Sequence, residues 1–292
     1  MIKRVFRRLM AVFSAGALLI GLSLPVNAQP STALEIGIIP YLPTPTILER
    51  YKPLRTFLEQ RLREPVSIVT APDYASFIER TQRRDYPFVI TVSHAARLAE
   101  LEAGYQPMLR PGWDTYATLL VRKDSAFQDI KDLRGKTIAT PGPYAIVSQL
   151  GADWLKKVGL KPGQDVTLQS NLTHTTSLHA VAEGAADAAF ISNRAFVAAK
   201  SDMKDRVRSL GQSKDSGGPG VVYLAHPALS AQRVAAVKAA ILAFIQTPEG
   251  KEFVASLGYD TLREMKSGEM EILDPYVREL KHVMAANKPA KQ

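Results

Sequence analysis

The chain has no cysteine among its 292 residues, and it has only five histidines. Without thiols, disulfide scaffolds, thiolate-bound zinc or iron–sulfur clusters, cysteine nucleophiles and cysteine-linked lipid anchors are all excluded. The chain is instead rich in ordinary core-forming residues, with 46% hydrophobic and 22% charged residues. This composition is typical of a globular protein with a real hydrophobic core.

The first 28 residues have the pattern of a secretory signal peptide. Lys3, Arg4, Arg7 and Arg8 precede an apolar run over residues 9–24, and Val26-Asn27-Ala28 places small residues where a cleavage site needs them. We therefore expect cleavage after Ala28 and a periplasmic location. Removing these four basic residues lowers the formal net charge from +9 to +5.

The remaining basic residues form no nucleic-acid-binding arm. Their densest cluster is Arg80, Arg83 and Arg84, and no aromatic residues alternate with them as stacking platforms for bases. Nucleic acid is therefore not an expected partner.

Short apolar runs alternate with amphipathic segments along the chain. Strands are expected over residues 34–40, 66–71 and 88–92, and again over 136–139, 166–168 and 188–191, with helices between them. This alternation predicts an α/β fold with mainly parallel sheets flanked by helices.

Extended segments interrupt the pattern and predict two crossings between lobes. The first spans residues 105–109 and 115–122, and the return crossing falls at 221–224. We expect residues 29–124 and 209–292 to form lobe 1 and residues 125–208 to form an inserted lobe 2. The two crossings would then act as a hinge.

Three junctions between a strand and a helix are expected to face a cleft between the lobes. They are Ser93-His94, residues 141–144 and residues 173–175. Helix amino termini carry unpaired N–H groups and a partial positive charge, so they favour a small anion without any basic side chain. The candidate ligand-binding residues are Tyr41, Tyr74, Ser93, His94, Tyr116, Pro143, Tyr144, His174, Thr175 and Asn193.

The order of several short segments resembles the phosphate, phosphite and phosphonate-binding periplasmic proteins of ABC importers, which are type II solute-binding proteins. The matching segments are Ile36-Gly37-Ile38-Ile39-Pro40, Tyr51-Lys52-Pro53-Leu54, Asp73-Tyr74-Ala75-Ser76-Phe77-Ile78-Glu79, Asp132-Leu133-Arg134-Gly135-Lys136, His174 ten residues before Gly184, Ala186-Asp187-Ala188-Ala189, and Thr247-Pro248-Glu249-Gly250. No single segment is specific, but their order and spacing cover nearly the whole chain after residue 28.

The resemblance implies a receptor that closes its lobes around a small anionic solute and presents it to an ABC permease. It implies a monomer with no cofactor and no catalysis. It also implies that the side chains at Tyr74 and His174 face the ligand.

The resemblance breaks at one loop. Phosphonate binders of the family have a loop rich in serine and threonine before the first long helix of the second lobe, whereas this chain has Pro141-Gly142-Pro143-Tyr144-Ala145-Ile146. Pro143 lacks even a backbone N–H. Each charge-assisted hydrogen bond lost here is worth ~1.5–3 kcal/mol, so a phosphonate dianion would bind weakly.

Other functions are compatible with the same cleft. One is a sensory receptor for a membrane histidine kinase, and another is a small-molecule enzyme that uses His174 as acid or base. A zinc site is not expected, because His174 and His179 are five residues apart and their rings would diverge on a helix.

Overall fold

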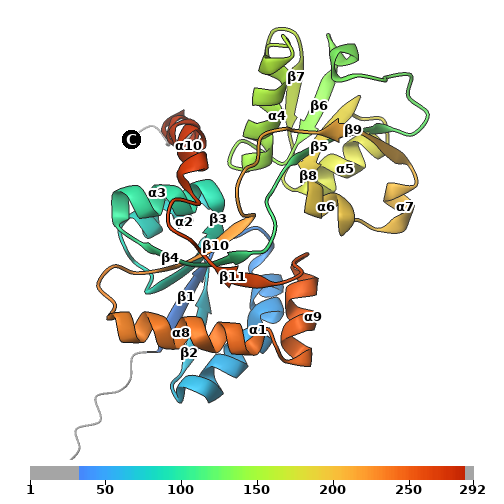
Figure 1. Cartoon of the computed structure of the whole chain (residues 1–292). Coiled ribbons are helices and arrows are strands. Elements are labelled where there is room, and N and C mark those ends of the chain that lie inside the picture. Colours follow the sequence, from blue (N-terminus) through green and yellow to red (C-terminus); the bar gives the residue numbers. More distant parts are fainter. Residues whose placement is uncertain (1–32, 287–292) are drawn as a thin grey trace, which may run out of the picture. The chain divides into compact units, whose positions relative to one another are not determined.

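The structure is a computed structural model that describes residues 33–286. Within this range the chain forms two sheets, each flanked by helices (Figure 1). The signal peptide expected over residues 1–28 lies outside the described residues.

The first sheet has the strand order β11-β4-β10-β3-β1-β2 within residues 33–286. Its strands are β1 (Leu34–Ile38), β2 (Val66–Val69), β3 (Phe88–Val92), β4 (Gln106–Pro111), β10 (Val221–Ala225) and β11 (Leu262–Glu264). β1 pairs in parallel with β2 and β3, while β10 pairs antiparallel with β3 and β4. We refer to this sheet and its helices as the first lobe.

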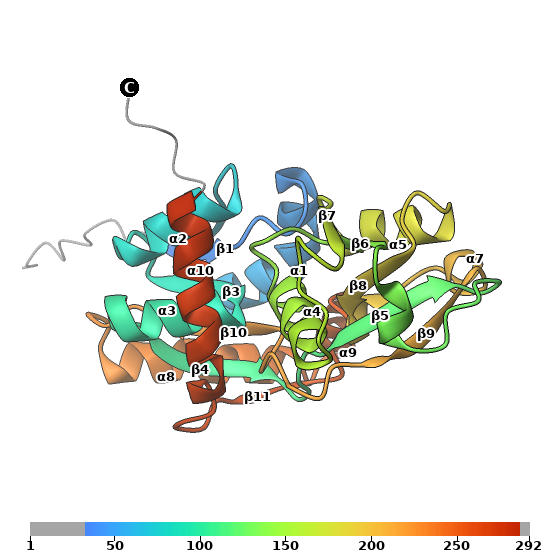
Figure 2. The same ribbon diagram turned by 90° about the horizontal axis from the view of Figure 1, so that it is seen from above.

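Helices cover both faces of the first sheet (Figure 1). They are α1 (Thr44–Leu62), α2 (Tyr74–Gln82), α3 (Ser93–Ala103), α8 (Ala231–Phe244), α9 (Pro248–Ser256), a short η2 (Glu271–Leu273) and α10 (Asp274–Ala286). α1, α8 and α9 lie on one face, and α2, α3 and α10 on the other. Figure 2 shows α10 running beside α3, with which it makes extensive contact.

The second sheet has the order β7-β6-β8-β5-β9 within the described part of the chain. Its strands are β5 (Ala117–Arg122), β6 (Thr137–Thr140), β7 (Thr167–Ser170), β8 (Ala188–Ser192) and β9 (Val207–Gln212). Its helices are η1 (Ile130–Leu133), α4 (Ile146–Lys157), α5 (His174–Ala182), α6 (Asn193–Val197) and α7 (Ser201–Lys204). These elements form the second lobe.

Close packing requires glycine at two positions in these lobes. A Cβ on Gly37 in β1 would lie 2.7 Å from the Tyr86 ring, and one on Gly151 in α4 would lie 2.5 Å from the Phe190 ring. Real Cβ atoms do not approach other atoms this closely. Each glycine therefore lets a large aromatic ring fill the core of its lobe.

The chain passes between the sheets at residues 112–116 and returns at 213–220. These two crossings are bonded to each other, because Thr115 N–H donates to the Gly218 carbonyl at 2.7 Å and Gly217 N–H donates to the Thr115 carbonyl at 2.8 Å. An isolated bridge also joins Asp114 to Pro219. The lobes are thus connected by a paired two-stranded segment.

The sheets divide the chain at other residues than the expected limits at 124/125 and 208/209. β5 and β9 pair with one another in the second sheet, although residues 115–122 were expected to cross and 207–212 were not expected as a strand. β4 likewise belongs to the first sheet, and β10, expected as the return crossing, pairs inside it. The crossings are therefore shorter than the sequence indicates, because extended backbone looks alike in a connection and in a sheet.

Candidate functional site

Tyr74 and Tyr144 meet although they come from different lobes. Tyr74 is the first residue of α2, whose cap Asp73 accepts a hydrogen bond from Ser76 N–H at 2.8 Å. Tyr144 precedes α4 in the second lobe. Their ring centroids are 6.3 Å apart with planes inclined by 31°, which is within the range of a favourable aromatic pair.

Tyr144 also packs against buried apolar residues of the first lobe. The buried cluster that it contacts consists of Ile78, Ala95, Leu98, Val277 and Leu280, from α2, α3 and α10. The loop before α4 is therefore seated on first-lobe helices. We call this the apolar contact.

His94 lies at the apolar contact, in the first turn of α3. Its side chain is fully buried, and burial lowers its pKa to about 4; the adjacent Tyr144 backbone offsets a part of this effect. The imidazole is therefore neutral at neutral pH. Its neighbour Ser93 is also buried and donates from Oγ to the Gly217 carbonyl at 2.9 Å, which ties α3 to the return crossing.

The helices that begin at this contact, α3 in the first lobe and α4 in the second, have no side-chain cap. Val92 and Ala145 occupy their N-cap positions and offer no side-chain acceptor. By contrast, Asp73 caps α2 and Thr173 caps α5. The first N–H groups of a helix have no partner inside it, so α3 and α4 keep donors and positive potential that an anion can use.

His174 is the first residue of α5, after a capping box made by Thr173 and Thr176. Its Nδ1 accepts a hydrogen bond from Ser192 N–H at 3.4 Å, so the neutral ring carries its proton on Nε2. Burial lowers the pKa of His174 to about 4. The side chain therefore presents a neutral Nε2–H donor.

The loops before α4 and α5 lie side by side, because β6 and β7 are parallel neighbours and Asn171 N–H donates to the Thr140 carbonyl at 2.7 Å. Of the candidates on these loops, Pro143 and Thr175 are exposed. They lie at the same end of the sheet as His174 and Tyr144.

Tyr41 follows β1 and packs beside Tyr74 in the first lobe. Burial and, secondarily, the neighbouring Tyr41 raise the pKa of Tyr74 to about 12. Both phenols are therefore neutral hydrogen-bonding groups near neutral pH. The contacts thus gather Tyr41, Tyr74, His94 and Tyr144 around one place between the lobes.

Tyr116 and Asn193 lie together elsewhere, at the hinge. Asn193 Oδ1 accepts from Tyr116 N–H at 3.2 Å, and its Nδ2 donates to the Asp114 carbonyl at 3.2 Å. The Asn193 backbone N–H also donates to the Tyr116 carbonyl at 3.0 Å. The Asn193 side chain is thereby used to fix the first crossing to the start of α6.

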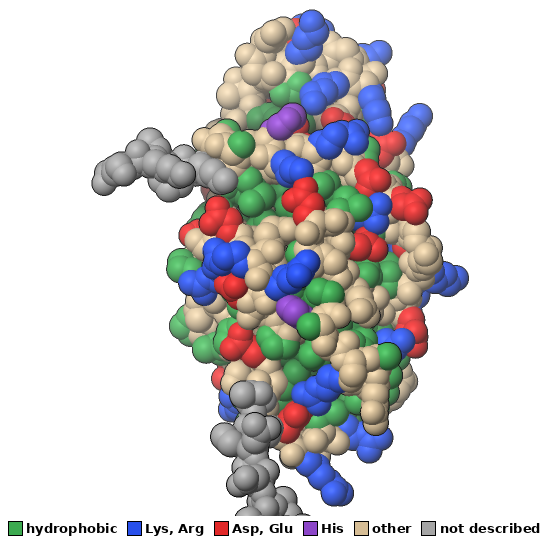
Figure 3. Space-filling model, turned by 90° about the vertical axis from the view of Figure 1, so that its left-hand side faces the viewer, with side chains coloured by type: hydrophobic (Ala, Val, Ile, Leu, Met, Phe, Trp, Pro, Cys, Tyr) green, Lys and Arg blue, Asp and Glu red, His purple; other side chains and the backbone are tan. Residues whose placement is uncertain are grey.

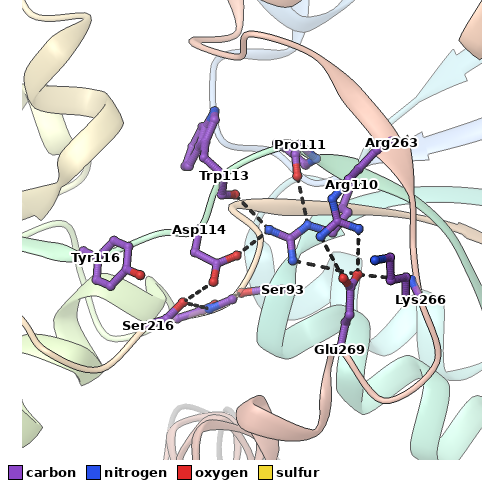
Figure 4. Close-up of polar contacts among 12 residues, drawn as sticks. Ser93, Arg110, Pro111, Trp113, Asp114, Tyr116, Ser216, Arg263, Lys266 and Glu269 are labelled. Carbon is purple, nitrogen blue, oxygen red and sulfur yellow. Dashed lines mark hydrogen bonds and ion pairs between the residues drawn. The ribbon is translucent and has the colours of Figure 1, made fainter.

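A cavity of about 530 Å³ opens beside the hinge, lined in part by Arg110, Asp114, Tyr116, Arg263 and Glu269. Figure 4 shows the Arg110 guanidinium, which is 5% exposed, surrounded by the Pro111 and Trp113 carbonyls and the Asp114 carboxylate.

Acceptors and donors at this cavity are matched. Asp114 Oδ2 accepts from Ser216 Oγ at 2.9 Å, which joins the two crossings. Arg263 bonds Glu269 through two atoms at 2.7 and 3.0 Å and lowers the pKa of that carboxyl. The charges are balanced and mutually satisfied, so the cavity has the character of a hinge support.

The charges on one face of the molecule and the spacing of potential metal ligands bear on other kinds of site. On the face in Figure 3, basic and acidic side chains are interspersed. Within residues 33–286, no group of three potential metal ligands lies close enough to hold an ion. In the same range, no helix has both the length and the apolar character for crossing a membrane.

Sequence reasoning missed Arg194, which links the lobes. It lies in α6 of the second lobe and bonds Gly258 of the first. Its position after Asn193, at the end of a buried strand, was the available signal. A lone arginine there has no distinctive spacing, so its contact is visible only in the fold.

Comparison with known proteins places the chain in a family. The model of the family described as ABC transporter, phosphonate, periplasmic substrate-binding protein matches residues 36–269.

Solved structures share the fold at low sequence identity. PhnD1 from Prochlorococcus marinus in complex with methylphosphonate has a TM-score of 0.74 and 14% identity over 85% of this chain and 98% of its own. XAC2383 from Xanthomonas citri bound to ATP has a TM-score of 0.69 and 18% identity over 88% and 100%. A binding protein component of an ABC phosphonate transporter from Pseudomonas aeruginosa has a TM-score of 0.69 and 16% identity over 88% and 99%.

The two-lobed type II fold expected from the sequence is thus confirmed. The family consists of substrate-binding proteins of ABC transporters and not of enzymes, so the expectation of no catalysis holds. The chain belongs to the phosphonate-type periplasmic substrate-binding proteins of ABC transporters.

Proposed function

We propose that this protein binds a small anionic solute between its lobes and delivers it to an ABC permease, after export to the periplasm by a signal peptide over residues 1–28. The observation that carries the proposal is that the loop before α4 lies against the start of α3, with the Tyr144 backbone next to His94. α3 and α4 come from different lobes, and both begin without a side-chain cap. A solute held by both helices would favour the closed arrangement of the lobes.

The donors at this site are neutral, which bears on the solute. His94 and His174 are uncharged near neutral pH and the tyrosines are protonated. A dianion would receive only helix-dipole and neutral hydrogen-bond stabilisation, since the loop at 141–144 supplies aromatic and proline side chains. We therefore propose a singly charged oxyanion or organic acid with an apolar portion against Tyr74 and Tyr144.

A ligand screen tests this proposal. The protein purified from the periplasm would be tested by thermal shift with phosphate, phosphite, methylphosphonate, methanesulfonate and small carboxylates, and hits would be titrated calorimetrically. We expect at least one monoanion to raise the melting temperature in a concentration-dependent way and to be recovered unchanged. A screen in which no anion binds would contradict the proposal.

A pair of matched variants locates the site. We expect His174→Ala to weaken binding of the hit about ten-fold, because it removes the Nε2–H donor and a donor to a charged group is worth ~1.5–3 kcal/mol. His282→Ala is the control, since the His282 side chain is 80% exposed on α10. Uptake of the labelled hit by cells that depends on this chain would separate a permease partner from a sensor kinase.

A further inference from the structure

Arg194 makes a bond between the lobes that involves no candidate ligand-binding side chain. Its Nε donates to the Gly258 carbonyl at 2.8 Å, and its guanidinium lies over the Trp113 ring at 4.2 Å from the centroid. Trp113 in turn packs on Tyr259, with ring centroids 5.8 Å apart. The contact thus joins α6 of the second lobe to the end of α9 in the first. We call the bond from Arg194 to Gly258, together with the contact of Arg194 with Trp113, the clasp.

The end of α9 is a good receptor for a cation. Gly258 N–H donates to the Ala255 carbonyl and Tyr259 N–H to the Val254 carbonyl, each at 2.9 Å. These two bonds form a Schellman motif, with Gly258 at φ +75°. The Gly258 carbonyl remains to accept from Arg194, at the helix end where a positive charge is favoured.

The position of Arg194 is fixed by its neighbours. Asn193 bonds the first crossing at Asp114 and Tyr116, and Ser192 Oγ caps α6 by accepting from Ala195 N–H at 3.0 Å. α6 therefore moves with the crossing. The bond from Arg194 to Gly258 reaches the first lobe, so any rotation that separates α6 from the end of α9 breaks it, because a hydrogen bond of 2.8 Å is lost over a short displacement.

We propose that Arg194 is a positioning residue that holds the lobes in the arrangement that binds solute. It acts through the Gly258 carbonyl and the Trp113 ring, and its effect on affinity rests on the proposed function. The binding-competent arrangement sets the apparent affinity in proportion to its population. Losing the clasp therefore lowers affinity by lowering that population, and it changes the lobe arrangement before any ligand is added.

Because the native chain has no cysteine, spin labels can be attached to introduced cysteines alone, and the arrangement of the lobes can be measured. Glu49→Cys on α1 and His179→Cys on α5 place spin labels at exposed positions of the two lobes. Double electron–electron resonance spectroscopy of the ligand-free, spin-labelled protein gives the distribution of distances between the lobes. We expect Arg194→Gln to shift this distribution to longer distances, and Arg194→Lys, which keeps the charge but not the Nε donor, to shift it less.

Arg206→Gln is the matched control, because exposed Arg206 pairs with Glu183 inside the second lobe. Circular dichroism melts would establish that each variant is folded. We expect Arg194→Gln also to raise the Kd of the anion found in the screen about ten-fold. Superimposable ligand-free distributions for the parent and Arg194→Gln would overturn the proposal, even with binding lost, since that pattern means direct ligand contact. If no anion binds, the distance measurement on the ligand-free protein still shows whether Arg194 holds the lobes in this arrangement.

Discussion

Two contacts between the lobes use opposite chemistry. At the apolar contact, Tyr144 rests on α2, α3 and α10. At the clasp, Arg194 forms one directional bond to Gly258 and a cation–π contact with Trp113. Apolar packing tolerates small sliding movements, whereas a hydrogen bond is lost over a short displacement. We therefore expect the apolar contact to tolerate sliding of the lobes and the clasp to favour one arrangement.

Acid should destabilise the apolar contact, and we expect this to be the largest of the effects on the free energy of unfolding. The pKa of His94 is about 4 in the folded protein against an ordinary 6.5, so the unfolded chain binds the proton more tightly. The contribution of His94 to the free energy of unfolding is complete above pH 6.5. It is lost as the pH falls from 6.5 to 4, by about 3 kcal/mol. Urea unfolding at pH 7, 5 and 4 measures this loss.

The matched control for that experiment is His94→Gln, which removes the titrating group. The difference between the parent and this variant isolates His94 from His174, whose pKa is lowered in the same direction. A parent protein that loses no more stability between pH 6.5 and 4 than His94→Gln would contradict the assignment.

Disruption of the hydrogen-bond network at the hinge cavity should have the next largest effect on stability. Asp114 accepts from both Arg110 and Ser216, so Asp114→Asn leaves the buried guanidinium with Glu269, at 3.9 Å, as its remaining carboxylate partner. We expect a loss of about 2 kcal/mol in the free energy of unfolding. Asp124→Asn is the control, because its pair with Arg122 is exposed. Equal effects of the two substitutions would show that the hinge network adds no stability.

Truncation of the Tyr144 side chain at the apolar contact should cost less stability than either change above. Tyr144→Ala removes a half-buried ring from the cluster on α3 and α10, and we expect about 1–2 kcal/mol. Tyr144→Phe keeps the ring and separates the effect of ring packing from that of the hydroxyl. In the spin-labelled protein, Tyr144→Ala should broaden the distance distribution, whereas unchanged width would show that Tyr144 does not hold the lobes.

The sequence predicts the two-lobed architecture better than it predicts every element and the residues where the lobes begin and end. The strand at 88–92 and the Asp73 cap were visible in the alternation of apolar runs and in cap chemistry, because both depend on local residues. The short β11 and the C-terminal α10 were missed. β11 has three residues and carries no pattern distinct from a loop until it packs on β4. α10 does carry a helical pattern, because Tyr276, Val277 and Leu280 recur on one face after Asp274-Pro275, so this helix could have been predicted.

Prediction of the site shows the same division. The strand-to-helix junctions pointed to Tyr74, His94 and Tyr144, and the fold brings these together. Whether they and the other candidates contact ligand stays a prediction. Periodicity does not reveal that Asn193 bonds a crossing or that Arg194 reaches another lobe, because those contacts join residues more than 60 positions apart.

Backbone amide signals measure the central claim most directly. Nitrogen–proton correlation spectra of the labelled protein would be recorded during titration with the anion found in the screen. The account expects the largest shifts at the first residues of α3 and α4, around His94 and Val147, and smaller ones at Ser76 and Thr176, whose N–H groups are held by side-chain caps. Shifts confined to the hinge cavity around Arg110, or scattered over the surface, would contradict a solute held between the lobes.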